Sequence, residues 1–143
     1  MSEFMHALVK DGHIADVYVA KPESQAIATV VILQEIFGIT DHIKDICQQY
    51  AAHGYLVIAP ALYDRIRKNI VLDYSSFAEG VDYKMQLNDE QTLMDIEAAI
   101  ALVENTSKVA VVGFCFGGAL SYLASTRLNL SCAISYYGGG IAE

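Results

Sequence analysis

The stretch that decides the fold is Gly-Phe-Cys-Phe-Gly-Gly at residues 113–118. It follows the apolar, β-branched run 108–112 and precedes residues 119–127, whose composition favours a helix. A strand, a turn tightened by glycines and a helix, with a thiol at the tip of the turn, are typical of a nucleophile elbow. The dipole at the N-terminus of the helix favours a thiolate there. The sequence therefore predicts that Cys115 is a nucleophile.

The glycines around Cys115 support this interpretation. A sharp strand-to-helix turn crowds the positions two before and two after the nucleophile, and Gly113 and Gly117 occupy these positions. Gly118 allows the helix to approach the sheet closely. We expect the backbone N–H of Phe116 to point toward the reaction centre and to hold a developing oxyanion.

A second candidate segment is Gln-Glu-Ile-Phe-Gly at residues 34–38, directly after the apolar run Ala28–Leu33. The run is typical of a buried parallel strand, and loops at the carboxyl ends of such strands line the active crevice. Glu35 is therefore expected to face Cys115 and to hydrogen-bond or deprotonate its thiol. The N–H of Ile36 occupies the position from which hydrolases supply a second oxyanion donor.

The rest of the chain alternates between strand and helix patterns, which predicts one α/β domain with a mostly parallel sheet. Asp11-Gly12 predicts a two-residue hairpin loop with positive φ at both positions, and residues 105–107 interrupt the pattern before the fifth strand. The expected strands are 3–10, 13–20, 28–33, 55–59, 108–112 and 131–137, and the expected helices are 40–53, 75–87, 88–103 and 119–127.

Composition narrows the class of protein. The 143 residues are 54% hydrophobic and 18% charged, and their net charge of −8 disfavours binding to nucleic acid. No apolar run reaches the roughly 18 residues of a membrane span, and no secretory signal is recognisable at the N-terminus. Three widely spaced cysteines predict no disulfide framework and a cytoplasmic location, with Cys47 and Cys132 in the core. We expect no metal and no organic cofactor.

Four segments together resemble the dienelactone hydrolase family, which is carboxymethylenebutenolidase-like and belongs to the α/β-hydrolase superfamily. They are residues 34–38, Ala59-Pro60-Ala61-Leu62-Tyr63, the elbow with the following Ala-Leu, and Ser135-Tyr136-Tyr137-Gly138, within a match from about residue 28 onward. The resemblance implies an α/β-hydrolase-type sheet and cleavage of esters or lactones through an acyl-thioester by a Cys-His-Asp triad.

The same resemblance implies individual roles. Cys115 would be the nucleophile, Glu35 the carboxylate that pairs with it at rest, Ile36 and Phe116 the oxyanion amides, and Tyr83 a residue that lines the substrate pocket.

The sequence departs from the family pattern in the substrate pocket. Glu79 stands where the family has an arginine for a substrate carboxylate, and Gln86 stands where it has an aromatic residue. Both differences argue against a dienelactone carboxylate as the substrate. Arg65 and Arg67 are nearby, but we interpret them as residues of a surface loop.

A further departure concerns the base. The family's Asp and His come later in the chain than the nucleophile, whereas all four histidines here precede Cys115. His42 is the histidine nearest the predicted crevice, and we interpret it as a surface residue at a helix start. We therefore expect an N-terminal portion of the domain, truncated after the sixth strand, with at most residual activity by itself. The exposed edge of its last strand would invite pairing with a second copy.

Two other interpretations remain open at the level of sequence. A glutamine-amidotransferase-like enzyme also carries a Gly-x-Cys-x-Gly elbow, although this would not account for residues 34–38. A thiol sensor or binding module without catalysis would instead form a reversible oxidation product at Cys115.

Overall fold

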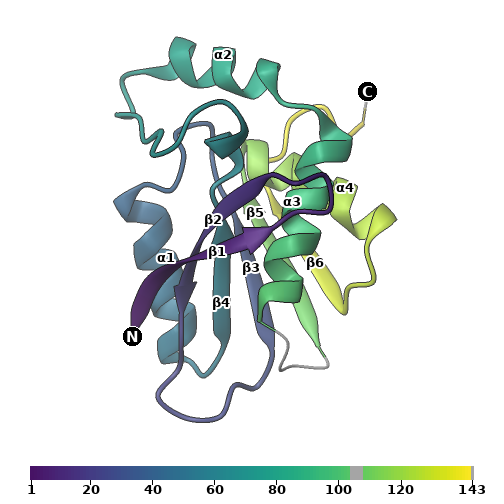
Figure 1. The fold of residues 1–143 in the computed structure, drawn as a ribbon. Coiled ribbons are helices and arrows are strands. Elements are labelled where there is room, and N and C mark those ends of the chain that lie inside the picture. Colours follow the sequence, from purple (N-terminus) through teal and green to yellow (C-terminus); the bar gives the residue numbers. More distant parts are fainter. Residues whose placement is uncertain (104–107, 143) are drawn as a thin grey trace.

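The computed structural model describes residues 1–103 and 108–142, so the predicted break at 105–107 lies outside the described residues. Within this part of the chain, six strands form one mixed sheet in the order β1-β2-β4-β3-β5-β6 (Figure 1). The strands are β1 (Ser2–Leu8), β2 (Ile14–Ala20), β3 (Thr29–Leu33), β4 (Leu56–Pro60), β5 (Val109–Phe114) and β6 (Cys132–Tyr136). The hairpin β1-β2 is antiparallel, β2 pairs antiparallel with β4, and the remaining pairs are parallel. The predicted α/β fold is confirmed.

Two of the helices begin with a side-chain cap. The Thr40 side chain accepts a hydrogen bond from the N–H of Ile43, and Asn88 accepts one from the N–H of Gln91. The helices are α1 (Asp41–Ala52), α2 (Phe77–Gln86), α3 (Asp89–Leu102) and α4 (Phe116–Arg127), with a short 3-10 helix η1 (Leu62–Arg65). In the described part of the chain, none of the helices combines the length and the apolarity that crossing a bilayer requires.

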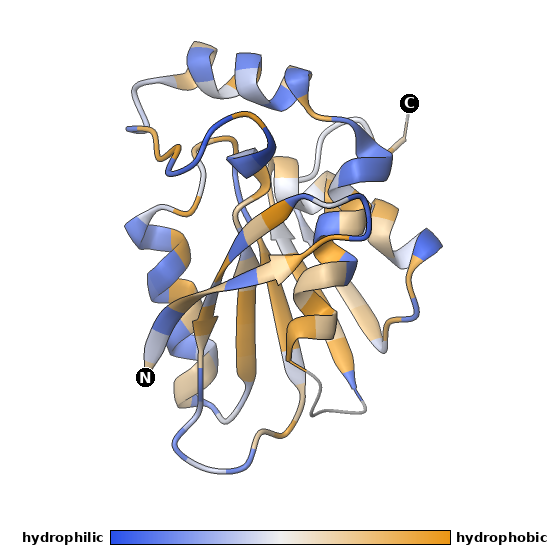
Figure 2. Cartoon of the chain, viewed as in Figure 1, coloured by the Kyte–Doolittle hydropathy of each residue, from blue (hydrophilic) through white to orange (hydrophobic). Residues whose placement is uncertain are grey.

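The sheet separates two hydrophobic cores. On one face, α1 packs against Val30 and Ile32 of β3, and on the other face α3 and α4 pack against Val31 and Leu33. The central strands β3 and β4 are accordingly apolar along their length, while the helices carry polar residues away from the sheet (Figure 2). Burial on both faces explains why β3 reads as a continuous apolar run.

The hairpin loop differs from the prediction. Gly12 has a φ of +92°, but Asp11 is not among the residues with positive φ. The N–H of Val9 donates to the carbonyl oxygen of His13, which closes a loop of three residues between them. A three-residue hairpin loop needs a single left-handed residue at its end, and Gly12 supplies it. The predicted two-residue loop is therefore wrong.

The two cysteines predicted to be core residues behave differently. Cys47 is fully buried on α1, and burial raises the pKa of its thiol to about 12. Cys132 is exposed, so its prediction as a core residue is wrong. The reason is its place on β6, the edge strand, because α1 packs against β2, β3 and β4 and leaves this face of β6 uncovered.

This difference predicts the labelling behaviour of the native protein. A rise of the thiol pKa to about 12 reduces the thiolate fraction of Cys47 roughly 1,000-fold. We expect a disulfide reagent at neutral pH to label Cys132 readily and Cys47 at least about 100-fold more slowly. Unfolding in guanidinium should bring Cys47 to the rate of Cys132. Equal labelling of the two thiols in the native protein would contradict the burial described.

Candidate active site

Cys115 lies at the junction between β5 and α4. It is the N-cap residue of α4, with φ of +56° and ψ of −117°. A positive φ at a residue with a side chain costs of the order of 1–3 kcal/mol and must be held by its surroundings. The backbone N–H of Cys115 donates to the carbonyl oxygen of Tyr136 at 3.0 Å, which ties the turn to β6. The predicted strand–turn–helix geometry of the elbow is confirmed.

Gly113 and Gly117 allow backbone segments to approach so closely that a side chain at either position would overlap them. A Cβ on Gly113 would overlap the carbonyl oxygen of Gly117. A Cβ on Gly117 would overlap the carbonyl of Leu33 and lie 2.6 Å from the carbonyl oxygen of Gln34. The first turn of α4 therefore rests directly on the backbone at the end of β3, beside the segment that contains Glu35.

The two predicted oxyanion amides lie in these adjoining segments. Phe116 is the first residue of α4, so its N–H has no acceptor within the helix. Ile36 is buried in the loop after β3. In the described part of the chain, neither N–H donates to a protein acceptor. Both amides are thus free to bind an oxygen that carries developing negative charge.

Glu35 is held by two phenols. The hydroxyl of Tyr74 donates to Oε1 at 3.0 Å, and the hydroxyl of Tyr137 donates to Oε2 at 3.4 Å. No hydrogen bond joins Glu35 to Cys115 in the described residues, so the expected resting pair is not formed in this conformation. A phenol O–H is a stronger donor to a carboxylate than a thiol S–H.

Tyr74 is fixed by the loop whose carboxylate it binds. Its ring lies edge-on to Phe37, with 4.7 Å between ring centroids. The N–H of Leu72 donates to the carbonyl oxygen of Phe37 at 2.9 Å. Residues 71–74 are therefore attached to the segment 35–38 by backbone as well as by side chains.

Tyr137 connects Glu35 with Cys115. Its pKa is raised, first by burial and then by the charges of Glu35 and Cys115. Two charges can act on one phenol only if both are near it. Glu35 and Cys115 therefore both lie near the Tyr137 side chain, at the carboxyl ends of β3 and β5.

Tyr83, predicted to line the pocket, belongs to a row of aromatic rings. It lies half-buried on α2, and its ring centroid is 5.5 Å from that of Tyr63. Tyr63 in turn stacks on Phe116 at 6.4 Å. The Tyr83 hydroxyl accepts a hydrogen bond from Arg67 at 3.3 Å. The row extends from the elbow to α2, so Tyr83 is on the correct side of the sheet for its predicted role.

Arg65 is engaged elsewhere. Its guanidinium donates twice to the Asp95 carboxylate, at 2.9 and 2.8 Å, and once to Asp11 at 2.8 Å. Burial lowers the pKa of Arg65, but the hydrogen bonds and charges of Asp95 and Asp11 together outweigh this, so the pKa is raised. This arginine links α3 to the β1-β2 hairpin and does not serve as a free cation for a substrate.

The histidines lie away from the thiol. In the described residues, none of them makes a hydrogen bond or a ring contact with Cys115. His42 is exposed at the start of α1. His6 pairs with Asp16 at 2.8 Å, and His53 bonds the carbonyl of Gln49 at 2.8 Å. The fourth, His13, is half-buried beside the Asp95 carboxylate.

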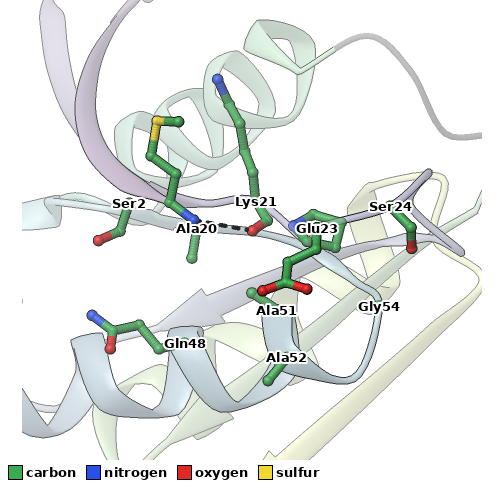
Figure 3. A pocket seen from close by; sticks show the side chains of 11 residues that line it. Ser2, Ala20, Lys21, Glu23, Ser24, Gln48, Ala51, Ala52 and Gly54 are labelled. Atoms are coloured by element: carbon green, nitrogen blue, oxygen red, sulfur yellow. Dashed lines mark hydrogen bonds between the residues drawn. The ribbon is translucent and has the colours of Figure 1, made fainter.

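A broad hollow of about 570 Å³ lies at the other end of the sheet (Figure 3). Lys21, Glu23, Gln48 and Gly54 are among the residues that line it, and the N-terminal amine donates to the carbonyl of Lys21 across it. Both β4 and β5 pair with β3 in parallel, so the three strands run in the same direction. Gly54 precedes β4 and Cys115 follows β5, which places them at opposite ends of the sheet. The hollow is therefore remote from the elbow, and no cysteine or histidine is among the described residues that line it.

A sheet of this order with a tight strand–turn–helix elbow after β5 has the α/β-hydrolase fold. The chain belongs to the dienelactone hydrolase family, whose sequence profile matches residues 15–143. The glutamine-amidotransferase-like alternative is thereby removed.

Individual relatives support this assignment. A Yersinia pestis protein assigned as a carboxymethylenebutenolidase is 37% identical over 134 residues, which cover 88% of this chain and 49% of that protein. Carboxymethylenebutenolidase 1 of Cupriavidus pinatubonensis is 34% identical over 150 residues, covering 100% of this chain and 64% of that protein. The crystal structure of a Klebsiella pneumoniae protein assigned as a dienelactone hydrolase has a TM-score of 0.82 and 29% identity, over 96% of this chain and 60% of that one. The chain thus spans about half to two thirds of the length of these relatives.

Sequence reasoning did not assign a role to several residues that shape this site. Tyr63 and Tyr137 belong to motifs named in the sequence analysis, but the sequence did not indicate which residues they hydrogen-bond. Gln34 likewise preceded Glu35 without a predicted function. Tyr74 lies in a polar stretch without a periodic pattern, and its partner Glu35 is 39 residues away. No feature of the sequence therefore predicted their hydrogen bond.

The contact between α4 and β3 predicts the effect of Gly117→Ala. Alanine gains at most about 1 kcal/mol in helix propensity. Its Cβ would overlap backbone carbonyls, which cannot move aside cheaply, so we expect a net loss of about 1–3 kcal/mol in the free energy of unfolding. Urea denaturation measures this loss. Gly139→Ala is the matched control, because a Cβ there meets nothing within 4 Å, and its change should stay within about 0.5 kcal/mol. Equal stability of both variants would contradict the close approach.

Proposed function

We propose that this chain carries the acyl-accepting half of a thiol hydrolase that cleaves esters or lactones. The observation that supports this most directly is the elbow itself, a strained Cys115 at the N-terminus of α4 with the unpaired amides of Ile36 and Phe116 in adjoining segments. The family membership agrees with a small-molecule ester or lactone as the substrate.

The proposed first step is attack of the Cys115 thiolate on the acyl carbonyl carbon. The electron pair of the C=O bond moves to oxygen, and the N–H groups of Ile36 and Phe116 bind the resulting oxyanion. Collapse of this intermediate reforms the C=O bond and expels the alkoxide, which leaves an acyl-thioester on Cys115. A lactone would open in the same step, and its alkoxide would remain attached to the acyl chain.

In this proposal Glu35 is the acid–base partner of the thiol. Tyr137, which binds its carboxylate, also lies near Cys115, and in this proposal Tyr74 and Tyr137 hold the carboxylate until it takes the thiol proton. A substrate that displaces the Tyr137 hydroxyl would bring the carboxylate within reach of the sulfur. Tyr83 is proposed to line the acyl or leaving-group side of the pocket, through the aromatic row from Phe116.

Hydrolysis of the thioester requires a base that activates water. In the described residues no histidine contacts Cys115, so we infer that the acyl-thioester accumulates on this chain. Acylation and turnover are then separable: the first is expected, and the second at most at a residual rate.

This proposal predicts a stoichiometric burst with p-nitrophenyl acetate. We expect about one equivalent of nitrophenolate per chain, followed by turnover that is slower by at least about 100-fold, because the acylation geometry is present without a base for deacylation. Stopped-flow absorbance follows the burst, and intact mass measures the added acetyl group.

Two variants make the test specific. Cys115→Ala should abolish the burst, whereas Cys132→Ser, which removes the other accessible thiol, should retain it. A parent chain without a burst would contradict the proposed function. Reversible oxidation of Cys115 in the same preparation, with no acylation, would favour the thiol sensor instead.

We further propose that the chain associates with a second copy through β6. The strand is at the edge of the sheet, and Ile134 is 41% exposed beside Tyr136 and Cys132. An unpaired edge strand with apolar neighbours favours pairing with another chain.

The expected result is a concentration-dependent rise in mass, measured by light scattering. Ile134→Lys should shift this association to at least about tenfold higher concentration, because a charge on an edge strand opposes pairing. Phe77→Lys is the control, since Phe77 is an apolar residue on α2 that is more exposed than Ile134, at 62%. A strict monomer at high concentration would contradict the proposal.

The location that we propose is the cytoplasm, on the ground that Cys47, Cys115 and Cys132 are all free thiols.

A further inference from the structure

We propose that Tyr63, together with Gln34, is a positioning residue that orients the Ile36 amide toward the oxyanion. The inference rests on the proposed function and deepens it, because it names the side chains that set the oxyanion site. In the described residues neither side chain forms a hydrogen bond with Cys115, and both act through the backbone of the loop after β3.

Gln34 fixes the peptide unit to which the Ile36 N–H belongs. Its side-chain Nε2 donates to the carbonyl oxygen of Glu35 at 3.1 Å, and its Oε1 accepts from the N–H of Leu62 at 3.0 Å. The peptide between Glu35 and Ile36 is planar and trans, so its N–H points opposite to its C=O. Holding the Glu35 carbonyl therefore sets the direction of the Ile36 N–H.

Tyr63 fixes the next peptide unit. Its hydroxyl donates to the carbonyl oxygen of Ile36 at 2.8 Å and lies 3.1 Å from the carbonyl oxygen of Gly80 on α2. The residue is 2% exposed, so no water competes for this donor. Burial, followed by the charge of Cys115, raises the pKa of Tyr63. The phenol therefore keeps its proton, and remains a hydrogen-bond donor, at neutral pH. Ile36 is thus held on both sides from the interior of the protein.

The Tyr63 ring also lies beside the side chain of Phe116, the residue whose N–H is the second oxyanion amide. It stacks on Phe116 at 6.4 Å with 15° between the ring planes. On the α2 side, a Cβ on Gly80 would lie 2.7 Å from the Ile36 carbonyl oxygen, which shows how tightly that carbonyl is enclosed. The Tyr63 side chain therefore links Ile36, Phe116 and α2. Because its hydroxyl binds the Ile36 carbonyl, removal of the hydroxyl would mainly loosen the backbone at Ile36.

A core tyrosine can also be purely structural, and the two roles make different predictions. Acylation of Cys115 by an ester passes through an oxyanion, whereas alkylation by iodoacetamide is a direct displacement that forms none. A positioning role for the oxyanion amide lowers the acylation rate alone. A structural role alters both rates together, through the elbow or through global stability.

The experiment compares Tyr63→Phe with the parent chain, both carrying Cys132→Ser so that one accessible thiol remains. Loss of a whole oxyanion donor costs about 100- to 1,000-fold in rate. For a donor that is loosened and not removed, we expect acylation by p-nitrophenyl acetate to fall about 10- to 100-fold. Alkylation by iodoacetamide should stay within about twofold of the parent rate.

Tyr18→Phe is the matched control. Tyr18 is also buried, and its hydroxyl accepts a hydrogen bond from Gln48 at 3.0 Å, but it belongs to the core on the α1 face. Both of its rates should stay within about twofold of the parent. Gln34→Met, which removes the other hold on the loop, should show the same split as Tyr63→Phe, so the inference does not depend on a single variant.

The outcomes separate the two levels of inference. A parent chain that acylates no faster than Cys115→Ala overturns the proposed function and the role of Tyr63 with it. A parent chain that acylates, with Tyr63→Phe unchanged or with acylation and alkylation slowed equally, overturns the positioning role alone. A selective loss of acylation in Tyr63→Phe and Gln34→Met supports it.

Discussion

The site depends on the close approach of α4 to the end of β3. Gly117 rests on the carbonyls of Leu33 and Gln34, and this contact brings the first turn of the helix against the loop that carries Glu35 and Ile36. A displacement of about 1 Å in such a site can reduce a rate roughly 100-fold. The backbone contact is therefore both a packing constraint and a geometric requirement of the chemistry. It also explains why Cys115 keeps a positive φ, since the strand and the helix on either side are fixed independently.

Buried side chains stabilise this arrangement from behind. A hydrogen bond contributes about 1 kcal/mol net to folding, but a buried group left without a partner costs about 1–3 kcal/mol. Gln34 is fully buried and satisfies both the Leu62 N–H and the Glu35 carbonyl, so the loop has one favoured conformation. Because these contacts face the interior, the outer side of the same peptide units remains open to a ligand.

Whether a feature of the site was predictable from the sequence depends on how far apart its interacting residues lie along the chain. The elbow was predictable, because its glycines, thiol and flanking patterns are local in the chain and only a tight turn requires them together. The caps at Thr40 and Asn88 are local in the same sense, because each side chain binds an N–H three residues ahead. The partners of Glu35 were not, because Tyr74 and Tyr137 reach it across 39 and 102 residues and carry no periodic signal.

The wrong predictions have equally physical causes. Asp-Gly favours a tight turn, but whether one or two residues take positive φ depends on the register of the paired strands, here Leu8 opposite Ile14. Cys132 stands in an apolar strand, and such a pattern does not reveal whether a helix covers the strand. Exposure of a strand at a sheet edge is a property of the layers above it, which local sequence does not encode.

The contacts that form the site also explain why its two chemical steps can be separated. Every group that is proposed to stabilise the oxyanion is held by β3, η1, β5 and α4, and all of these contacts lie within the described residues. The described residues hold no histidine at Cys115 that could activate water, because the histidines lie on β1, in the hairpin loop and at the two ends of α1. Binding of negative charge thus depends on backbone geometry that this part of the fold fixes by itself. Proton transfer to water instead requires a basic side chain beside Cys115, and in the described residues no histidine forms a hydrogen bond with this thiol.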